Sequence, residues 1–316
     1  MSAEAVEPKL SIVATLYKSA AYVDEFCRRA AAVAQASVGD SYEIILVNDG
    51  SPDDSLARAI AMSRIDPHVT VVDLSRNFGH HKAMMTGLGQ ARSERVFLID
   101  SDLEEEPEWL AAFERQMSEH NCDVVYGVQA SRKGNWFERW SGRWFYVFFR
   151  LMTGLHLPEN IVTARLMSRR YVDALLQHDE REVFIAGLWL ITGFDQQPLQ
   201  VDKHTSSATT YTLRSKMSLL VNSVTSFSNG PLIAVFYVGL AILVLAVCYI
   251  VYLVGHFLVL KTPPSGWTSV MASIWFLGGL IISFIGVVGI YLSKIYSETK
   301  RRPYTIIRQV HRRGDD

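Results

Sequence analysis

The chain has few cysteines and no recognisable leader. Its 316 residues include three cysteines, Cys27, Cys122 and Cys248, whose spacing does not match a metal site. No disulfide is expected, because a reducing cytoplasm keeps such thiols free. The opening residues MSAEAVEPKL lack the basic start and the apolar core of a signal peptide, so we expect no such peptide.

Long parts of the chain also lack charge. Charged residues make up 20% of the sequence and the net charge is −1, but residues 217–260 and 262–293 contain no Asp, Glu, Lys or Arg. The apolar runs 231–260 and 267–293 are each long enough for a transmembrane helix, which needs about 20 residues. The sequence therefore predicts a membrane hairpin that follows a water-soluble part.

Basic residues lie at the two ends of this hairpin and not at its turn. Arg214 and Lys216 precede the first run and the tail from residue 294 is strongly basic, whereas the turn contains only Lys261. The positive-inside rule then places both termini in the cytoplasm. We expect a cytoplasmic domain over 1–212, a juxtamembrane helix over 213–230, the two membrane helices, and a basic cytoplasmic tail over 294–316.

Short apolar runs alternate with helical periodicity in the first 130 residues. Strands are predicted at 10–16, 42–48, 69–74, 95–100 and 122–127, and helices at 21–35, 53–64, 80–91 and 107–119. This alternation is typical of an α/β fold with a mostly parallel sheet and helices on both faces. In such sheets ligands bind beyond the carboxyl ends of the strands.

Acidic residues follow two of these strands, in VNDGSPDDS and in LIDSDLEEEP. Asp100 and Asp102 are two residues apart where the second of these strands ends, so their side chains can point the same way. Two converging carboxylates repel each other unless a cation lies between them, and Mg²⁺ or Mn²⁺ accepts such oxygen ligands. The later acids, at 105–108, are expected instead to favour the N-terminus of the next helix.

An aromatic and basic segment lies at 134–155. Trp136, Trp140 and Trp144 recur every four residues and so share one stripe of a helix, with arginines on either side. Such a stripe suits an amphipathic helix in the membrane interface. A helix buried under the sheet is the alternative.

Five motifs follow one another before the apolar runs: VNDGSPDDS, LSRNFGHHKAMMTGL, LIDSDLEEEPEWL, VYGVQASR and ARLMSRRYVDAL. In this order the chain resembles the family 2 glycosyltransferases, and among them the polyprenyl-phosphate (bactoprenol or dolichyl) glycosyltransferases. The resemblance covers roughly residues 8–295. It implies a GT-A, Rossmann-like fold and an inverting, metal-dependent transfer of a sugar from a nucleotide-diphosphate sugar to a polyprenyl phosphate.

The resemblance also implies a donor and metal site. Tyr17 and Asp49 would bind the nucleotide sugar, with Asp49 at the base. Asp100 and Asp102 would hold the Mg²⁺ or Mn²⁺ ion that neutralises the donor diphosphate. Glu104 stands where relatives often have Gln, and we favour it slightly as a further metal ligand over a residue that caps the helix.

Two arginines are expected to bind phosphate. Arg132 follows VYGVQAS and Arg165 lies in ARLMSRR, at positions where the family places phosphate-binding arginines. A guanidinium suits this role because its planar fork pairs with two phosphate oxygens. Together with Asp102 they are the expected catalytic residues. A phosphate acceptor is already an anion, so the reaction needs no general base.

The sequence departs from the family pattern in places, and this leaves the donor sugar open. Thr163 stands where relatives often carry an acid. If the acceptor were a hydroxyl of a glycolipid or lipid-linked saccharide, a base would be needed, and Asp102, Glu104 or His80 would be candidates. We otherwise expect His80 at a solvated helix start and Trp189 in the core. A non-catalytic scaffold that binds a nucleotide sugar is the remaining alternative.

The expected setting is the inner membrane of a bacterium. The lipid-linked product would serve the assembly or modification of a cell-surface glycan. The partners are then the nucleotide sugar, the polyprenyl phosphate and the membrane lipids, with no nucleic acid. Glycines in FLGGLIISFIGVVG would let helices pack closely, which makes a homo-oligomer possible.

Overall fold

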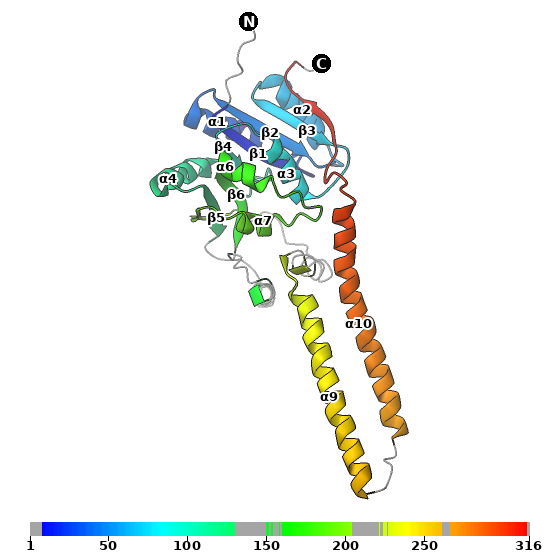
Figure 1. Cartoon of the computed structure of the whole chain (residues 1–316). Coiled ribbons are helices and arrows are strands. Elements are labelled where there is room, and N and C mark those ends of the chain that lie inside the picture. Colours follow the sequence, from blue (N-terminus) through cyan, green and yellow to red (C-terminus); the bar gives the residue numbers. More distant parts are fainter. Residues whose placement is uncertain are drawn as a thin grey trace. The chain divides into compact units, whose positions relative to one another are not determined.

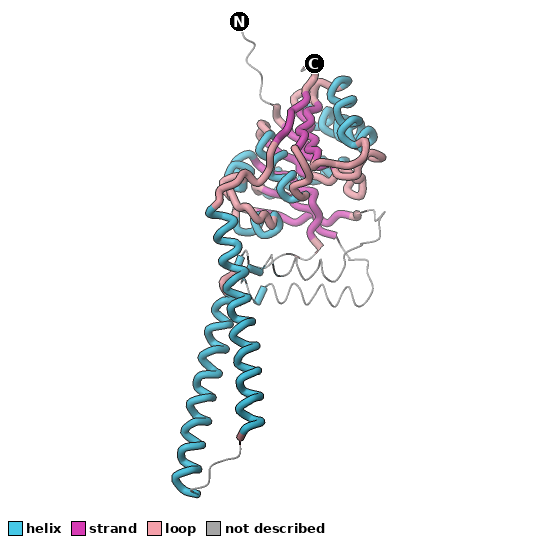
Figure 2. The backbone as a smooth tube through the Cα atoms, turned by 90° about the vertical axis from the view of Figure 1, so that its right-hand side faces the viewer, coloured by secondary structure: helices cyan, strands magenta, loops and turns pink. Residues whose placement is uncertain are grey.

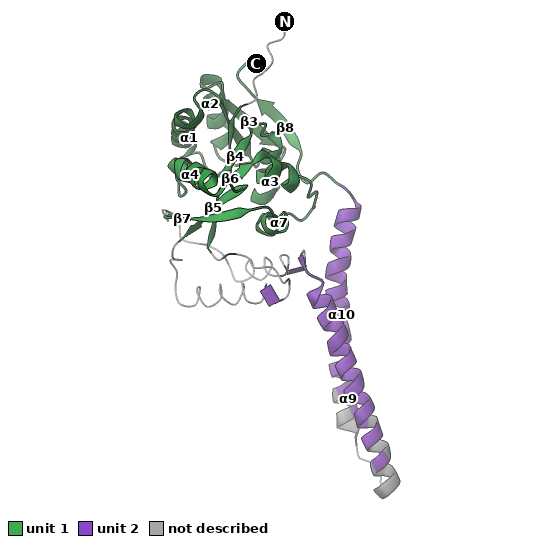
Figure 3. Ribbon diagram, turned by 60° about the vertical axis from the view of Figure 1, so that its left-hand side comes forward, with its two compact units in different colours: residues 1–146, 156–211, 302–316 green, residues 147–155, 212–301 purple. Residues whose placement is uncertain are grey.

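The structure, a computed structural model, falls into two compact units (Figure 3). Unit 1 comprises residues 1–146, 156–211 and 302–316, and unit 2 comprises residues 147–155 and 212–301. The residues that the structure describes are 8–129, 150, 151, 153, 158, 160–203, 221, 224, 225, 227–260 and 266–314.

In the described part of unit 1, eight strands form one sheet with the order β7-β5-β6-β4-β1-β2-β3-β8 (Figure 1). The strands are β1 (Leu10–Leu16), β2 (Tyr42–Asn48), β3 (Val69–Leu74), β4 (Arg95–Leu98), β5 (Val124–Gln129), β6 (Ile161–Ser168), β7 (Gln196–Val201) and β8 (Ile307–His311). β1 is parallel to β2 and β4, and β2 is parallel to β3. β6 and β8 are antiparallel to their neighbours, and β7 is parallel to β5.

Four helical segments of unit 1 lie where the periodicity predicts helices, and α6 and α7 are additional. They are α1 (Val23–Val38), α2 (Ser55–Ile65), α3 (His80–Gln90), the 3-10 helix η1 (Pro107–Trp109), α4 (Leu110–His120), α6 (Arg169–Leu175) and α7 (Ile185–Ile191). The predicted α/β fold class, a Rossmann-like sheet with helices on both faces, is therefore confirmed.

Alternating residues of the central strands bury the two faces of the sheet. Ile12 and Ile44 belong to the same hydrophobic cluster as Phe26 of α1 and Phe113 of α4. Their neighbours along the strands point to the other face, because successive strand residues alternate. There α3 packs, and its Gly87 comes so close that a Cβ would lie 2.5 Å from Cγ1 of Val13.

Unit 2 contains two long apolar helices. They are α9 (Gly230–Leu260) and α10 (Trp267–Thr299), which run side by side (Figure 2). Gly230–Tyr249 and Ser273–Thr299 are long and apolar enough to cross a membrane, by length and composition alone. The two predicted helices are thus present, and α10 continues six residues past the predicted end at 293.

Several expectations lie outside the described residues or differ from them. Arg132 and nearly all of the expected helix at 134–155 lie outside the described residues, as does most of the segment 213–230. The end of the chain was expected to be a basic tail. Instead, Ile307–His311 pair with β3 as an edge strand of the unit 1 sheet.

Candidate active site

The expected acidic residues lie at one edge of the sheet. β2 and β4 flank β1 and run parallel to it, so their carboxyl ends meet there. Asn48 is paired with Leu16 and with Asp73 in register, which aligns the ends of β1, β2 and β3. The motifs after β2 and β4 are therefore brought to the same place, where ligands of parallel sheets bind. Tyr17 follows β1 at this edge with 48% of its surface exposed.

Asp49 holds two loops together. Its carboxylate accepts hydrogen bonds of 2.7 and 3.0 Å from the backbone N–H groups of Phe78 and Gly79. Burial raises the pKa of Asp49, and the two hydrogen bonds only partly oppose this. Gly50 has a φ of 59°, and a Cβ there would lie 2.4 Å from the backbone nitrogen of Asn77. The predicted contact of Asp49 with a nucleotide base stays a prediction; the residue has a structural role already.

Asp100 is fixed between a threonine and a histidine. Thr163 of β6 donates a hydrogen bond of 2.8 Å to Oδ2, and Nε2 of His80 lies 3.3 Å from Oδ1. The other ring nitrogen of His80 lies 2.9 Å from Oγ1 of Thr15. Burial alone would raise the pKa of Asp100, but His80, Thr163 and Lys203 outweigh it and lower the pKa. These contacts favour the ionised form of Asp100 and position its carboxylate.

His80 is therefore not a solvated helix start without partners, as the sequence suggested. Its side chain is 49% exposed, but the ring is placed by Thr15 and Asp100. Partial burial disfavours the charged ring, yet the adjacent Asp100 carboxylate outweighs it and raises the pKa of His80.

Glu105 was expected to favour a helix start, and this expectation is wrong. The residue is fully buried, and the backbone N–H of Thr163 donates to its Oε1 at 3.0 Å. Burial and the charge of Asp100 raise the pKa of Glu105 to about 8. Lys203 follows β7 and lies outside the five motifs. Its Nζ is 3.6 Å from Glu105 and 3.3 Å from Glu104. No local pattern in the sequence joins these positions.

The two aspartates of the D-x-D motif fit a divalent ion in part. Oδ1 of Asp100 is buried, and the ring nitrogen of His80 at 3.3 Å is its neighbour of opposite charge when that ring is protonated. Burial and the nearby Asp100 charge raise the pKa of Asp102, and a cation would relieve this repulsion. Glu104, however, pairs with Lys203. Among the described residues, no three His, Cys, Asp or Glu side chains are arranged to hold a metal. The metal and its ligands stay a prediction.

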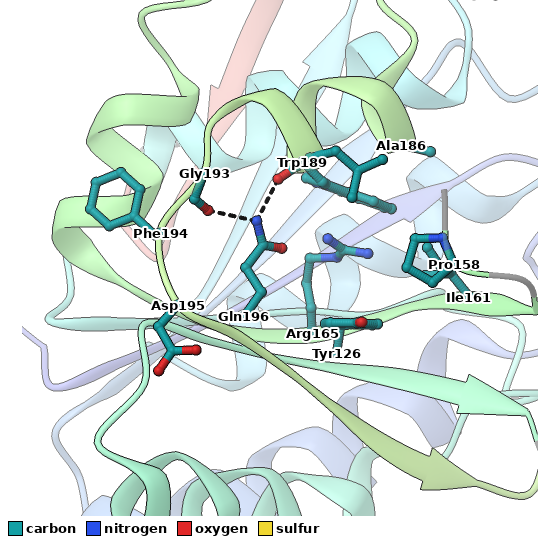
Figure 4. A pocket seen from close by; sticks show the side chains of 11 residues that line it. Tyr126, Pro158, Ile161, Arg165, Ala186, Trp189, Gly193, Phe194, Asp195 and Gln196 are labelled. Atoms are coloured by element: carbon teal, nitrogen blue, oxygen red, sulfur yellow. Dashed lines mark hydrogen bonds between the residues drawn. The ribbon is translucent and has the colours of Figure 1, made fainter. Parts of the chain in front are cut away.

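A cavity of about 320 Å³ opens beside Arg165 (Figure 4). Residues of β5, β6 and α7 and of the turn at 193–196 line it, with Tyr126, Trp189 and Phe194 as aromatic walls. Gln196 closes one side, because its Nε2 donates to the backbone oxygens of Trp189 and Gly193 at 2.6 and 2.7 Å. Most of the described residues that line the space are apolar; the charged ones are Arg165 and Asp195.

Arg165 is buried at this cavity and has no anionic partner among the described residues. It is 1% exposed, and its Cζ lies 2.9 Å from the centre of the Trp189 ring. Nε donates to the backbone oxygen of Thr163 at 3.3 Å, while Nη2 has no hydrogen-bond partner among the described residues. Burial lowers the pKa of Arg165 to about 9. A buried, unpaired guanidinium is costly, so the site favours an anion. Trp189 was expected in the core; it is buried, but its ring covers the arginine.

One strand, β6, both contacts Asp100 and lines the cavity. Thr163 and Arg165 are two residues apart on β6 and therefore point to the same face of the sheet. Thr163 bonds Asp100 and Arg165 lines the cavity. β6 thus carries both a hydrogen-bond partner of Asp100 and the guanidinium at the cavity.

Known proteins resemble this chain over nearly its whole length. Residues 11–176 match the family described as Glycosyl transferase family 2. A Mycobacterium tuberculosis (strain CDC 1551 / Oshkosh) protein whose name places it among glycosyltransferases is 50% identical over 303 residues, 96% of this chain and 88% of the relative. The SfII prophage-derived bactoprenol glucosyl transferase of Shigella flexneri is 31% identical over 275 residues, 85% of this chain and 88% of the relative.

Proposed function

The chain belongs to glycosyl transferase family 2, and we propose that it transfers a sugar from a nucleotide-diphosphate sugar to a polyprenyl phosphate. The transfer takes place at the cytoplasmic face of the membrane, inverts the anomeric carbon and requires Mg²⁺ or Mn²⁺. The product is a lipid-linked sugar for a cell-surface glycan. The similarity to a bactoprenol glucosyl transferase supports a lipid acceptor.

The observation that carries the proposal is the buried guanidinium of Arg165. It faces a cavity and has no anionic partner among the described residues. A phosphate oxygen is the partner that such a planar donor binds best, since it can accept two parallel hydrogen bonds. A lipid phosphate or the donor diphosphate would supply that oxygen.

The residues divide the work of the reaction between them. An oxygen of the lipid phosphate attacks the anomeric carbon, and the bond from that carbon to the donor diphosphate breaks. The nucleoside diphosphate leaves with the bonding electrons. Arg165 orients a phosphate group, and Lys203 adds positive charge beside the acids. Asp100 and Asp102 would hold the divalent ion, which stabilises the charge of the leaving diphosphate.

The hairpin explains why a lipid can be the acceptor. α9 and α10 are long and apolar enough to span a bilayer. The chain enters α9 after β7 and returns from α10 to β8, so both ends of the hairpin join unit 1. They then lie on the same side of the membrane as unit 1, and the basic flanks make that side the cytoplasm.

Release of nucleoside diphosphate tests the proposal. Purified protein in detergent is given a panel of nucleotide sugars, with and without polyprenyl phosphate and with Mg²⁺, Mn²⁺ or chelator. We expect release that needs both the lipid phosphate and the metal. Asp102→Asn should abolish it, whereas Asp40→Asn, which removes an exposed carboxylate before β2, should not. Release that is independent of lipid phosphate, or that needs a hydroxyl acceptor, would contradict the proposal.

A further inference from the structure

The C-terminal segment of the chain belongs to unit 1 and lies at the edge of its sheet. After α10, residues 307–311 form β8, which pairs antiparallel with β3 at the edge of the sheet (Figure 1). Ser75, directly after β3, donates its backbone N–H to the backbone oxygen of Ile306 at 2.9 Å. The segment therefore lies beside the carboxyl end of β3, where the loop 75–79 begins.

Arg308 of β8 neutralises a buried acid at this strand end. Its Nη1 lies 3.1 Å from Oδ2 of Asp73, and its Nη2 donates to the backbone oxygen of Ser75 at 2.7 Å. The Asp73 side chain is 3% exposed, whereas that of Arg308 is 58% exposed. Arg308 is the sole cation among the described residues that is paired with Asp73. Without it, a buried carboxylate would lose its counter-charge, which is unfavourable.

Asp73 also contacts Asn48, the last residue of β2 before the turn. Its Oδ1 accepts a hydrogen bond of 2.8 Å from Nδ2 of Asn48. The other amide atom, Oδ1 of Asn48, accepts from the backbone N–H of Ser51 at 3.3 Å. The next residue, Asp49, holds the backbone of Phe78 and Gly79. Hydrogen bonds thus link Arg308 through Asp73 and Asn48 to the loop 48–51. Asp49 of this loop in turn binds the loop 75–79, and both loops border the expected nucleotide site.

The same C-terminal segment also contacts α3. Thr305 Oγ1 lies 2.8 Å from Oγ1 of Thr86, and Thr86 donates to the backbone oxygen of Lys82 at 2.9 Å. α3 begins at His80, which lies beside Asp100. Two independent contacts therefore join the segment 305–308 to elements that carry the site.

We infer that Arg308 is a positioning residue for donor binding, and that it acts through Asp73 and Asn48 on the loops 48–51 and 75–79. The inference rests on the proposed use of a nucleotide-diphosphate donor. Arg308 itself touches neither substrate nor metal. The segment that follows the hairpin then supports the donor site, in addition to forming an edge strand of the sheet.

Two measurements on the full-length protein in detergent test this inference. The variants are Arg308→Gln, Arg308→Lys as the conservative change, and Arg312→Gln as the matched control. Arg312 is an exposed arginine just after β8, and its side chain forms no hydrogen bond or ion pair with the described residues. The control removes the same charge from the same segment. Circular dichroism and the thermal unfolding midpoint verify that each variant is folded.

The first measurement is hydrogen exchange of the two loops, which needs no substrate. In Arg308→Gln the amides of 48–51 and 75–79 should exchange about tenfold faster than in the wild type, because one charged hydrogen-bond group is lost. Arg308→Lys should restore part of the protection. Unchanged exchange in both loops would overturn the inference, whether or not the enzyme has the proposed activity.

The second measurement is steady-state kinetics with the donor that the wild type uses. Arg308→Gln should raise the KM for the nucleotide sugar about tenfold, with kcat and the KM for lipid phosphate within about twofold. Arg312→Gln should behave as the wild type. A fall in kcat with an unchanged donor KM, or equal effects of the two glutamine variants, would overturn the inference. If the wild type consumes no donor, the proposed function fails, and the exchange measurement alone decides on the positioning role.

Discussion

Thr163 Oγ1 donates a hydrogen bond of 2.8 Å to Oδ2 of Asp100, and this contact joins β6 to the end of β4. The backbone N–H of Thr163 donates to Glu105 as well, so that one residue contacts two acids of the site. A hydroxyl group stabilises the Asp100 carboxylate, whereas an acid at this position would repel it. The threonine therefore suits a site that already concentrates negative charge.

The first prediction concerns this contact. Thr163→Val keeps the shape of the side chain but removes the donor, so Asp100 loses a partner while buried. We expect the kcat/KM for sugar transfer to fall roughly tenfold. Thr163→Ser keeps the hydroxyl and should stay near the wild-type value. Equal activities of the valine and serine variants would show that the hydrogen bond has no role in catalysis.

The second prediction separates function from stability at Arg165. Arg165→Met removes a buried charge that has no anionic partner among the described residues. Transfer to polyprenyl phosphate should fall about 100-fold or more, since a charged phosphate contact is lost. The thermal unfolding midpoint should stay the same or rise, because an apolar side chain suits a buried place better than an unpaired cation. A large fall in the midpoint with retained activity would contradict both parts.

The third prediction concerns pH and Asp123, which directly precedes β5. Its carboxylate accepts hydrogen bonds from Ser168, at 2.8 Å, and from Arg170. Burial opposes ionisation, but Arg170 and Ser168 outweigh it and lower the pKa of Asp123. A lowered pKa stabilises the fold above the unfolded value of about 3.9, and this stability is lost as pH falls through the folded value.

Asp123→Asn should therefore lower the unfolding midpoint by about 4 °C at pH 7. The difference from the wild type should be constant between about pH 6 and 8 and shrink below about pH 4. Thermal unfolding at a series of pH values measures it. A difference that grows on acidification would have the wrong sign for this account.

The fourth prediction concerns the packing of α3. Gly87→Ala would place a Cβ 2.5 Å from Val13 Cγ1, so the helix that carries His80 must move away from the sheet. We expect a loss of about 1–3 kcal/mol in the free energy of unfolding. Gly89→Ala is the matched control, because its Cβ would meet Leu176 at 3.9 Å. It should stabilise the helix by up to about 1 kcal/mol. Denaturant unfolding measures both.

Local patterns were sufficient to predict much of the sheet. The runs at 10–16, 42–48 and 69–74 are rich in β-branched residues, and the structure has strands with those bounds. β8 was missed because IRQVH is short, sits in a basic tail and forms a strand only by pairing with β3. Its partner lies more than 200 residues away in the sequence, a separation that no local pattern reports.

Site residues that depend on distant neighbours were also missed. The D-x-D motif marked Asp100, but only the fold shows that His80 and Thr163 hold it. In the sequence Glu105 looks like one of several acids before a helix. Its burial beside Lys203 could not be predicted, because the end of β7 comes next to it only in the fold. Conversely, the resemblance pointed to Arg165 without revealing that it is buried and has no anionic partner among the described residues.

The most direct test of the central account is the mass of the lipid product. The purified enzyme is incubated with its nucleotide sugar, a divalent metal and polyprenyl phosphate, and the extracted lipid is analysed by mass spectrometry. The account predicts a lipid that is heavier by one sugar residue linked through the phosphate, and no such lipid from Asp102→Asn. A sugar found on a hydroxyl group, or a free sugar without lipid product, would contradict it.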